Sequence, residues 1–245
     1  MKYLWKRNRP LDKDGLLRLI AQMNTRDEKY TCSSETTSWK AHRKAETMDD
    51  PNLFPLLREI IRENEGKGKA QREVRSAAYF IYGRLLEKVF QKEDCDFFVR
   101  RLEVETNKYI LSSMLDRVHD WRISKGIVLT PGLDISPIID LTRDERWLVR
   151  HSAIYALIAC PGEESRQALA FYLQQEDEKA YKYEIYYANI AMQAIGKSED
   201  ILLLERFLKS RSPTLKNTAE YAIQCIRERE ATLQESCPPQ LWFGK

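Results

Sequence analysis

The sequence predicts an all-α fold, a right-handed α-solenoid of about five to six helical hairpins. Three observations predict it. Helical periodicity recurs along the chain. Strand signals are poor, because alternating patterns are few and no Asn-Gly or Asp-Gly turn separates two apolar segments. Small residues also stand in the middle of apolar helix faces, as in WLVRHSAIYALIACPG (147–162), where Ala153 and Ala156 let a neighbouring helix come close. Helices are therefore expected to stack on helices.

The first clear hairpin covers residues 51–91. In its first helix, 51–64, apolar residues recur at spacings of three and four, which is the stripe of a helix with one buried face. Pro51 opens this helix behind Asp49 and Asp50, which can cap its free amides. The sequence GKGK (66–69) breaks the chain, and a second, longer helix follows.

Four more hairpins follow the first, each with a short helix, a polar turn and a longer helix. When the second helices are aligned on their central small residue, those residues are 28 to 40 apart. A unit of this length cannot bury both apolar faces of its helices alone, so the units must stack. The paired ranges are 96–105 with 107–121, 134–144 with 145–160, 165–177 with 181–196, and 199–210 with 213–229, and the aligned residues are Ala78, Ser113, Ala153, Ala191 and Ala219.

The two ends of the chain differ from this array. Residues 1–50 are expected to form an N-terminal helical cap that could be a degenerate repeat, because TSWKAHRKAETM (37–48) aligns with the helix that begins near Trp147. Residues 51–229 form the expected repeat array. Residues 230–245 are expected to be a C-terminal tail.

The hairpin at 134–160 resembles the HEAT-repeat family, and also the HEAT-like bacterial repeats named after phycobilisome lyases. The match consists of Pro137 in the first helix, Asp144 in the turn, and Val149 with Arg150 at the start of the second helix. The resemblance implies that Asp144 and Arg150 bind one another and neighbouring units in a ladder. The motif decays in the other hairpins, so the resemblance specifies fold far better than function.

Composition suits a folded cytoplasmic protein. Hydrophobic residues make up 43% and charged residues 31% of the chain, and no segment is apolar enough to span a membrane. The basic start lacks the apolar core of a signal peptide. The five cysteines are widely spread without a CxxC pair, so we expect reduced thiols and no zinc site.

Enzymatic motifs are missing from the sequence, and we expect no catalytic residues, no cofactor and no metal. The chain has no phosphate-binding glycine loop, GxGxxG, GxSxG or HExxH. Its three histidines, His42, His119 and His151, belong to different predicted hairpins, which disfavours a shared metal site.

Four tyrosines lie within seven residues of AYKYEIYYANIAMQ (180–193). Tyr183 shares one helical face with Tyr186 and Tyr187. Together with the Asn189 amide they are a candidate protein- or ligand-binding patch, because tyrosine contributes area and a hydrogen bond at little entropy cost. The alternative is that they pack between helices with their hydroxyls at the edge.

A row of basic residues offers a second candidate site. Lys69, Arg72 and Arg75 recur every third residue, and Tyr79 and Tyr82 continue the row. Phosphates could bind along such a row. The alternative is a solvated face, which the small net charge of +3 and the interleaved Glu73 favour.

The function that the sequence favours is a non-catalytic protein-binding scaffold or adaptor that uses the concave surface of the array. The alternative is a nucleic-acid-binding protein or a DNA-repair glycosylase of the HEAT-like type, and a lyase that acts on a tetrapyrrole comes third. The expected partner is another protein, with nucleic acid as the alternative. The sequence selects no particular partner and no oligomeric state.

Overall fold

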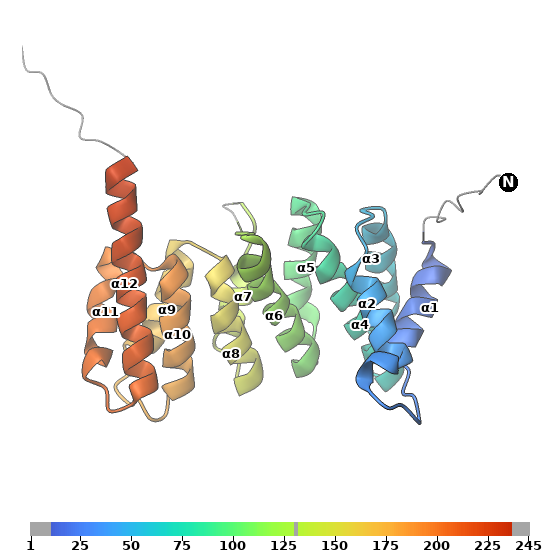
Figure 1. Ribbon diagram of the computed structural model, residues 1–245, viewed down its shortest axis with the longest axis horizontal. Helices are drawn as coiled ribbons and strands as arrows, with labels where there is room; N and C mark the ends of the chain where they lie inside the picture. The colour runs from blue at the N-terminus through green and yellow to red at the C-terminus, as the bar shows by residue number, and fades with distance from the viewer. Residues whose placement is uncertain (1–10, 130–131, 237–245) are drawn as a thin grey trace, which may run out of the picture. The chain divides into compact units, whose positions relative to one another are not determined.

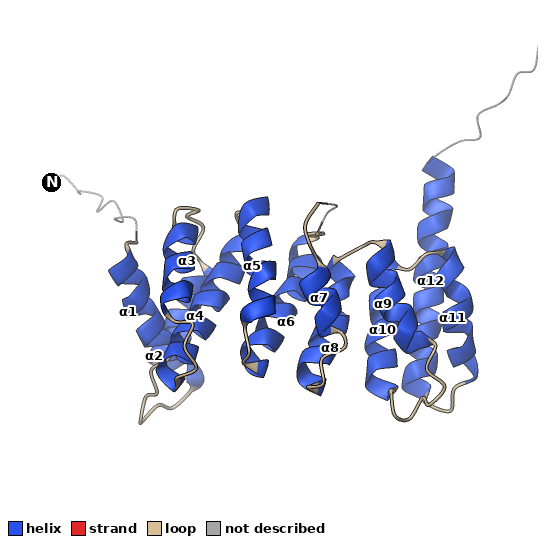
Figure 2. Ribbon diagram, turned by 180° about the vertical axis from the view of Figure 1, so that it is seen from behind, coloured by secondary structure: helices blue, strands red, loops and turns tan. Residues whose placement is uncertain are grey.

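The computed structural model describes residues 11–129 and 132–236, and every regular element in them is a helix (Figure 2). The predicted all-α class is confirmed. The chain divides into two compact units, the first ending at Met114 and the second beginning at Leu115.

Unit one contains three consecutive pairs of helices, and the third pair continues past its end. Short turns join α3 to α4 and α5 to α6, whereas a longer segment, residues 24–36 with a 3-10 helix at Ser33–Glu35, joins α1 to α2 (Figure 1). Helix α1 contacts α2 and α3, and α4 contacts α1, α2, α3 and α5. Each hairpin therefore packs on the next. The helices are α1 (Lys13–Met23), α2 (Thr37–Glu46), α3 (Leu53–Glu63), α4 (Lys69–Leu86), α5 (Lys92–Val104) and α6 (Lys108–Lys125).

Local side chains fix where these helices begin. The Asp12 carboxylate accepts a hydrogen bond from the Gly15 amide, 2.8 Å away, at the start of α1. Before α4, the Gln71 side chain folds back to accept from the Gly68 amide and lies against Gly66, where an added Cβ would collide with it. The predicted GKGK break is thus a turn whose glycine at position 66 leaves room for Gln71.

Unit two repeats the same stacking. First helices contact first helices, α7 with α9 and α9 with α11, and second helices contact second helices, α8 with α10 and α10 with α12. Hairpins that follow one another in this order are the defining feature of an α-solenoid. The elements are α7 (Ser136–Leu141), α8 (Trp147–Ala156), α9 (Glu163–Leu173), α10 (Lys182–Ile195), α11 (Ile201–Glu205) and α12 (Pro213–Ser236).

The alanines predicted at the helix seams are buried. Ala78, Ala153, Ala191 and Ala219 have no exposed surface. The prediction that Ser113 lies in a helix seam is wrong, because Ser113 is exposed on α6. The buried side of α6 carries larger residues instead, including Leu111, Met114, Leu115 and Val118.

Helices occupy both ends of the described part of the chain. Helices α1 and α2 do form a hairpin, while the role of residues 1–50 as a cap stays a prediction. Helix α12 continues past residue 229 to Ser236, so the first part of the predicted tail is helical, and the remainder of that tail lies outside the described residues. No helix in the described ranges has the length and apolar character that a membrane span needs.

Candidate binding surface on helices α8 and α10

Arg150, in the first turn of α8, joins its own hairpin to the next one. Its Nη1 donates to the Asp144 carbonyl oxygen at 2.7 Å, and its Nε and Nη2 donate to Glu184 Oε1 on α10 at 2.8 and 2.7 Å. The Asp144 carboxylate binds Arg146 instead, with Nε 2.8 Å from Oδ1. Arg150 therefore contacts the backbone of Asp144, and its carboxylate partner is Glu184, not the Asp144 side chain that the family resemblance implied.

The same arrangement occurs in unit one around Arg75 on α4. Its Nε and Nη2 donate to the two oxygens of Glu105 at 2.8 and 3.1 Å, and its Nη1 donates to the Gly66 carbonyl oxygen at 2.6 Å. Arg75 is 4% exposed. It is therefore a buried link between hairpins and does not face solvent for a phosphate.

The remaining basic residues of the predicted row do not form a continuous surface with Arg75. Lys69 is exposed and lies 3.8 Å from Glu73, and Arg72 donates to the Lys67 carbonyl oxygen. The two tyrosines that were expected to continue the row, Tyr79 and Tyr82, are buried. Most of the predicted row, namely Arg75, Tyr79 and Tyr82, therefore faces the core of unit one.

The first helices carry a second set of links. Arg58 on α3 bonds to Asp94 on α5, 36 residues along the chain, and Arg166 on α9 bonds to Asp200 before α11, 34 residues along. The arginines of the second helices reach 30 residues along the chain in unit one, to Glu105 in the turn after α5, and 34 residues in unit two, to Glu184 on α10. Arginine and carboxylate residues about one repeat apart are a sequence signal for these links between hairpins. The signal does not select the partners, because residue type and register differ too much from one hairpin to the next.

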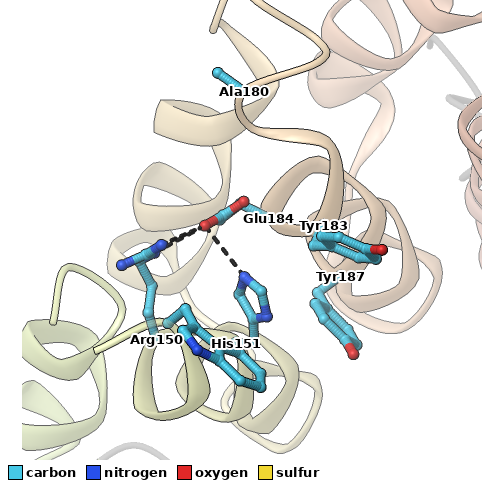
Figure 3. Close-up of a pocket in the computed structure, with 7 residues that line it drawn as sticks. Arg150, His151, Ala180, Tyr183, Glu184 and Tyr187 are labelled. Carbon is cyan, nitrogen blue, oxygen red and sulfur yellow. Dashed lines mark hydrogen bonds and ion pairs between the residues drawn. The ribbon is translucent and has the colours of Figure 1, made fainter. Parts of the chain in front are cut away.

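A pocket of about 510 Å³ lies between α8 and α10 in unit two. Figure 3 shows the Arg150–Glu184 bonds on one side of it and the rings of Tyr183 and Tyr187 on the other. Trp147 and Tyr183 are 62% and 61% exposed, which is unusual for such large side chains. The lining residues are Trp147, Arg150, His151, Ala180, Tyr183, Glu184 and Tyr187.

The pocket belongs to a continuous run of rings, here called the aromatic surface, made of Trp147, His151, Tyr155, Tyr183, Tyr187 and His119. The His151 ring is 5.6 Å from Trp147 and 5.3 Å from Tyr187, measured between centroids. Tyr187 is 5.5 Å from Tyr155, and Tyr155 stacks on His119 at 3.8 Å. The surface draws its side chains from α6, α8 and α10.

The sequence contained a signal for this surface beyond the predicted tyrosines. Residues 147, 151 and 155 are four apart, so their aromatic rings share one face of α8. Tyr183 and Tyr187 share a face of α10 in the same way. The sequence did not show that these two faces would lie next to one another.

Two residues of the predicted tyrosine patch lie elsewhere. Tyr186 contacts Tyr187, with ring centroids 5.2 Å apart, but does not line the pocket. Asn189 is fully buried and donates to Thr218 Oγ1 on α12 at 3.1 Å. Asn189 therefore belongs to the seam between α10 and α12 and is removed from the candidate surface.

The polar wall of the pocket is held in one charge state near neutral pH. Burial opposes ionisation of Glu184, but the hydrogen bonds from Arg150 and from the backbone, together with the nearby His151 ring, outweigh it and keep the pKa of Glu184 below its usual value. His151 Nε2 lies 3.1 Å from Glu184 Oε1. Burial lowers the pKa of His151, and the Glu184 carboxylate offsets only part of that effect. The wall thus combines a closed Arg150–Glu184 ion pair with a neutral imidazole.

Candidate metal ligands do not gather in the described parts of the chain, where no three His, Cys, Asp or Glu side chains are placed to hold an ion. His42 lies in unit one, with Nδ1 2.8 Å from the Ser38 carbonyl oxygen and its ring against Phe80. His119 and His151 both belong to the aromatic surface of unit two.

Comparison with known proteins adds little to this picture. No family model matches the chain, and no curated protein does. Among solved structures, a designed armadillo repeat protein, YIII(Dq)4CqI, is similar with 16% sequence identity and a TM-score of 0.48, over 86% of this chain and 99% of that one.

Proposed function

We propose that the protein is a non-catalytic binding scaffold whose aromatic surface in unit two holds another protein. The observation that carries the proposal is the exposure of Trp147 and Tyr183 at the mouth of a pocket. Exposed aromatic side chains next to a concavity are typical anchors of protein interfaces, because they bury large areas and lose few rotamers.

The rigidity of the pocket supports the same proposal. Tyr183 and Tyr187 project from one helix, Trp147 and His151 from its neighbour, and the Arg150–Glu184 bonds join the two helices. Helices joined in this way present the rings in a preorganised arrangement, which reduces the entropy lost when a partner binds.

Site-specific photocrosslinking tests the proposal. A benzoylphenylalanine replaces Tyr183 in the full chain, and the matched control carries it at Tyr221, which is 55% exposed on α12. We expect a protein crosslink from position 183 that is lost when Trp147→Ala is added, and none from position 221. Equal crosslinking from both positions, or no crosslink from 183 in cells that express the protein, would contradict the proposal.

The alternative of nucleic-acid binding has less support. Arg75 is buried in its contact with Glu105, and Arg150, the arginine that lines the pocket, is bonded to Glu184. Arginines already paired with carboxylates attract phosphates less than free ones do. A mobility-shift titration with single-stranded DNA at low and physiological salt tests this alternative, and tight salt-dependent binding would favour it over the protein-binding proposal.

A further inference from the structure

We propose that the occupant of the aromatic surface is the C-terminal segment of a second copy of this chain, with Trp242 and Phe243 bound in the pocket between α8 and α10. This inference rests on the proposed function and names the partner of the same surface. It follows from the chemistry of the pocket, from the sequence of the segment, and from the distance between the two within one chain.

The pocket suits an uncharged aromatic group. Its two charged side chains, Arg150 and Glu184, are bonded to each other at 2.8 and 2.7 Å, so together they present a closed, neutral pair (Figure 3). The side chains with the most exposed surface are the rings of Trp147 and Tyr183. Such rings bind best to other aromatic or apolar side chains, which bury large areas against them.

The sequence that follows α12 has this chemistry. Helix α12 ends at Ser236, and the next eight residues read CPPQLWFG (237–244), without a charged side chain. Leu241, Trp242 and Phe243 are consecutive, and three large apolar side chains gain free energy when they leave water together. These residues lie outside the described part of the chain, and the inference uses only their sequence and their distance from Ser236.

Helices α10 and α12 lie side by side and run in the same direction. Asn189 on α10 donates to Thr218 Oγ1 on α12 at 3.1 Å. Farther along both helices, Arg229 Nη2 donates to the Gly196 carbonyl oxygen at 2.6 Å, so the end of α10 is level with Arg229. Because a helix rises about 1.5 Å per residue, Ser236 stands about 10 Å past the end of α10. Figure 1 shows this extension of α12.

The distance along these helices excludes binding within one chain. Tyr183 is in the first turn of α10, thirteen residues before Gly196, so it lies about 30 Å below the level of Ser236. Trp242 is six residues beyond Ser236, and six residues span at most about 21 Å even when fully extended. Trp242 therefore cannot reach the pocket of its own chain, and the pocket that it fills belongs to a second copy.

Sedimentation of the full chain over a series of concentrations tests the inference. We expect the parent protein to self-associate. Trp242→Ala removes the proposed anchor and Trp147→Ala removes its contact in the pocket, so each should weaken self-association by more than about tenfold. Tyr221→Ala, which deletes another exposed aromatic side chain on α12, is the matched control and should leave it unchanged. Circular dichroism checks that all three variants keep their helix content.

Mixing the two variants tests the pairing directly. The Trp242→Ala chain keeps an intact pocket, and the Trp147→Ala chain keeps an intact C-terminal segment. A mixture should therefore form a complex at concentrations at which each variant alone is monomeric. A synthetic peptide of residues 236–245 should dissociate the parent complex, whereas the same peptide with alanine at positions 242 and 243 should not.

The inference is overturned if the parent protein stays monomeric, if Trp242→Ala associates as well as the parent, or if the mixed variants form no complex. The photocrosslink from position 183 separates this failure from failure of the proposed function. A crosslink to residues 237–245 of a second copy supports both proposals. A crosslink to a different protein would retain the scaffold and reject the second copy as its occupant, whereas no crosslink would reject both.

Discussion

Arg150 on α8 and Glu184 on α10 are 34 residues apart in the chain and are joined by two hydrogen bonds of 2.8 and 2.7 Å. Arg75 and Glu105 form the corresponding link in unit one. In both cases the guanidinium also holds carbonyl oxygens of the turn before its own helix. A single arginine thus fixes the turn within a hairpin and the spacing to the next hairpin.

Arg75→Met should destabilise the protein by about 3 kcal/mol, because it leaves Glu105 buried without its cation. The Glu105 side chain is 2% exposed. Arg72→Met, on the same helix, is the control and should cost less than about 1 kcal/mol, since Arg72 is only half-buried. Urea unfolding measures both values, and equal losses in the two variants would refute the structural role assigned to Arg75.

Ala153→Leu should cost about 1–3 kcal/mol, because Ala153 is fully buried in α8 and the added atoms have no space. Ala70→Leu, at an exposed position of α4, provides the control and should be nearly neutral. The midpoints of urea titrations give the comparison. An Ala153→Leu variant as stable as the parent would mean that the seam is not closely packed.

Gly196→Ala should lower stability by about 1–3 kcal/mol. Its Cβ would lie 2.7 Å from the Met192 carbonyl oxygen and 2.8 Å from Ile226 Cδ1 of α12, so the end of α10 would have to shift. Gly162→Ala is the matched control, because nothing lies within 4 Å of a Cβ there and its extended backbone accepts any residue. Thermal unfolding should separate the two variants, and similar melting temperatures would count against this close approach.

The titration of His151 should make stability depend on pH. Its pKa is lowered in the folded protein, chiefly by burial, from an ordinary value of 6.5. The unfolded chain therefore takes up the proton first, so stability is full above about pH 6.5 and declines as the pH falls towards the folded pKa. His151→Gln should remove this part of the decline.

Proton NMR of the His151 ring checks the cause directly. We expect a titration midpoint below 6.5 in the parent protein. Glu184→Gln should lower that midpoint further, since the carboxylate stabilises the protonated ring. A midpoint that rises in Glu184→Gln would show that the two side chains do not interact as described.

Much of the fold could be predicted from the sequence. The helical hairpins between residues 51 and 229 are present, and four of the five aligned small residues are fully buried. These features are local, because a stripe at spacings of three and four marks the buried face of a helix whatever it packs against. Ser113 is the exception. It lies in α6, where the apolar residues are spread around the helix and do not mark a single buried face.

The candidate site was predicted in part, since Tyr183 and Tyr187 do line the pocket. The contributions of Trp147 and Tyr155, the burial of Arg75 and Asn189, and the choice of Glu184 as the partner of Arg150 were decided by the tertiary structure. The physical reason is that helical periodicity depends only on neighbours within one turn. The rotation of each helix about its axis, and hence which side chains meet across a seam, depends on packing against residues about one repeat away in the chain.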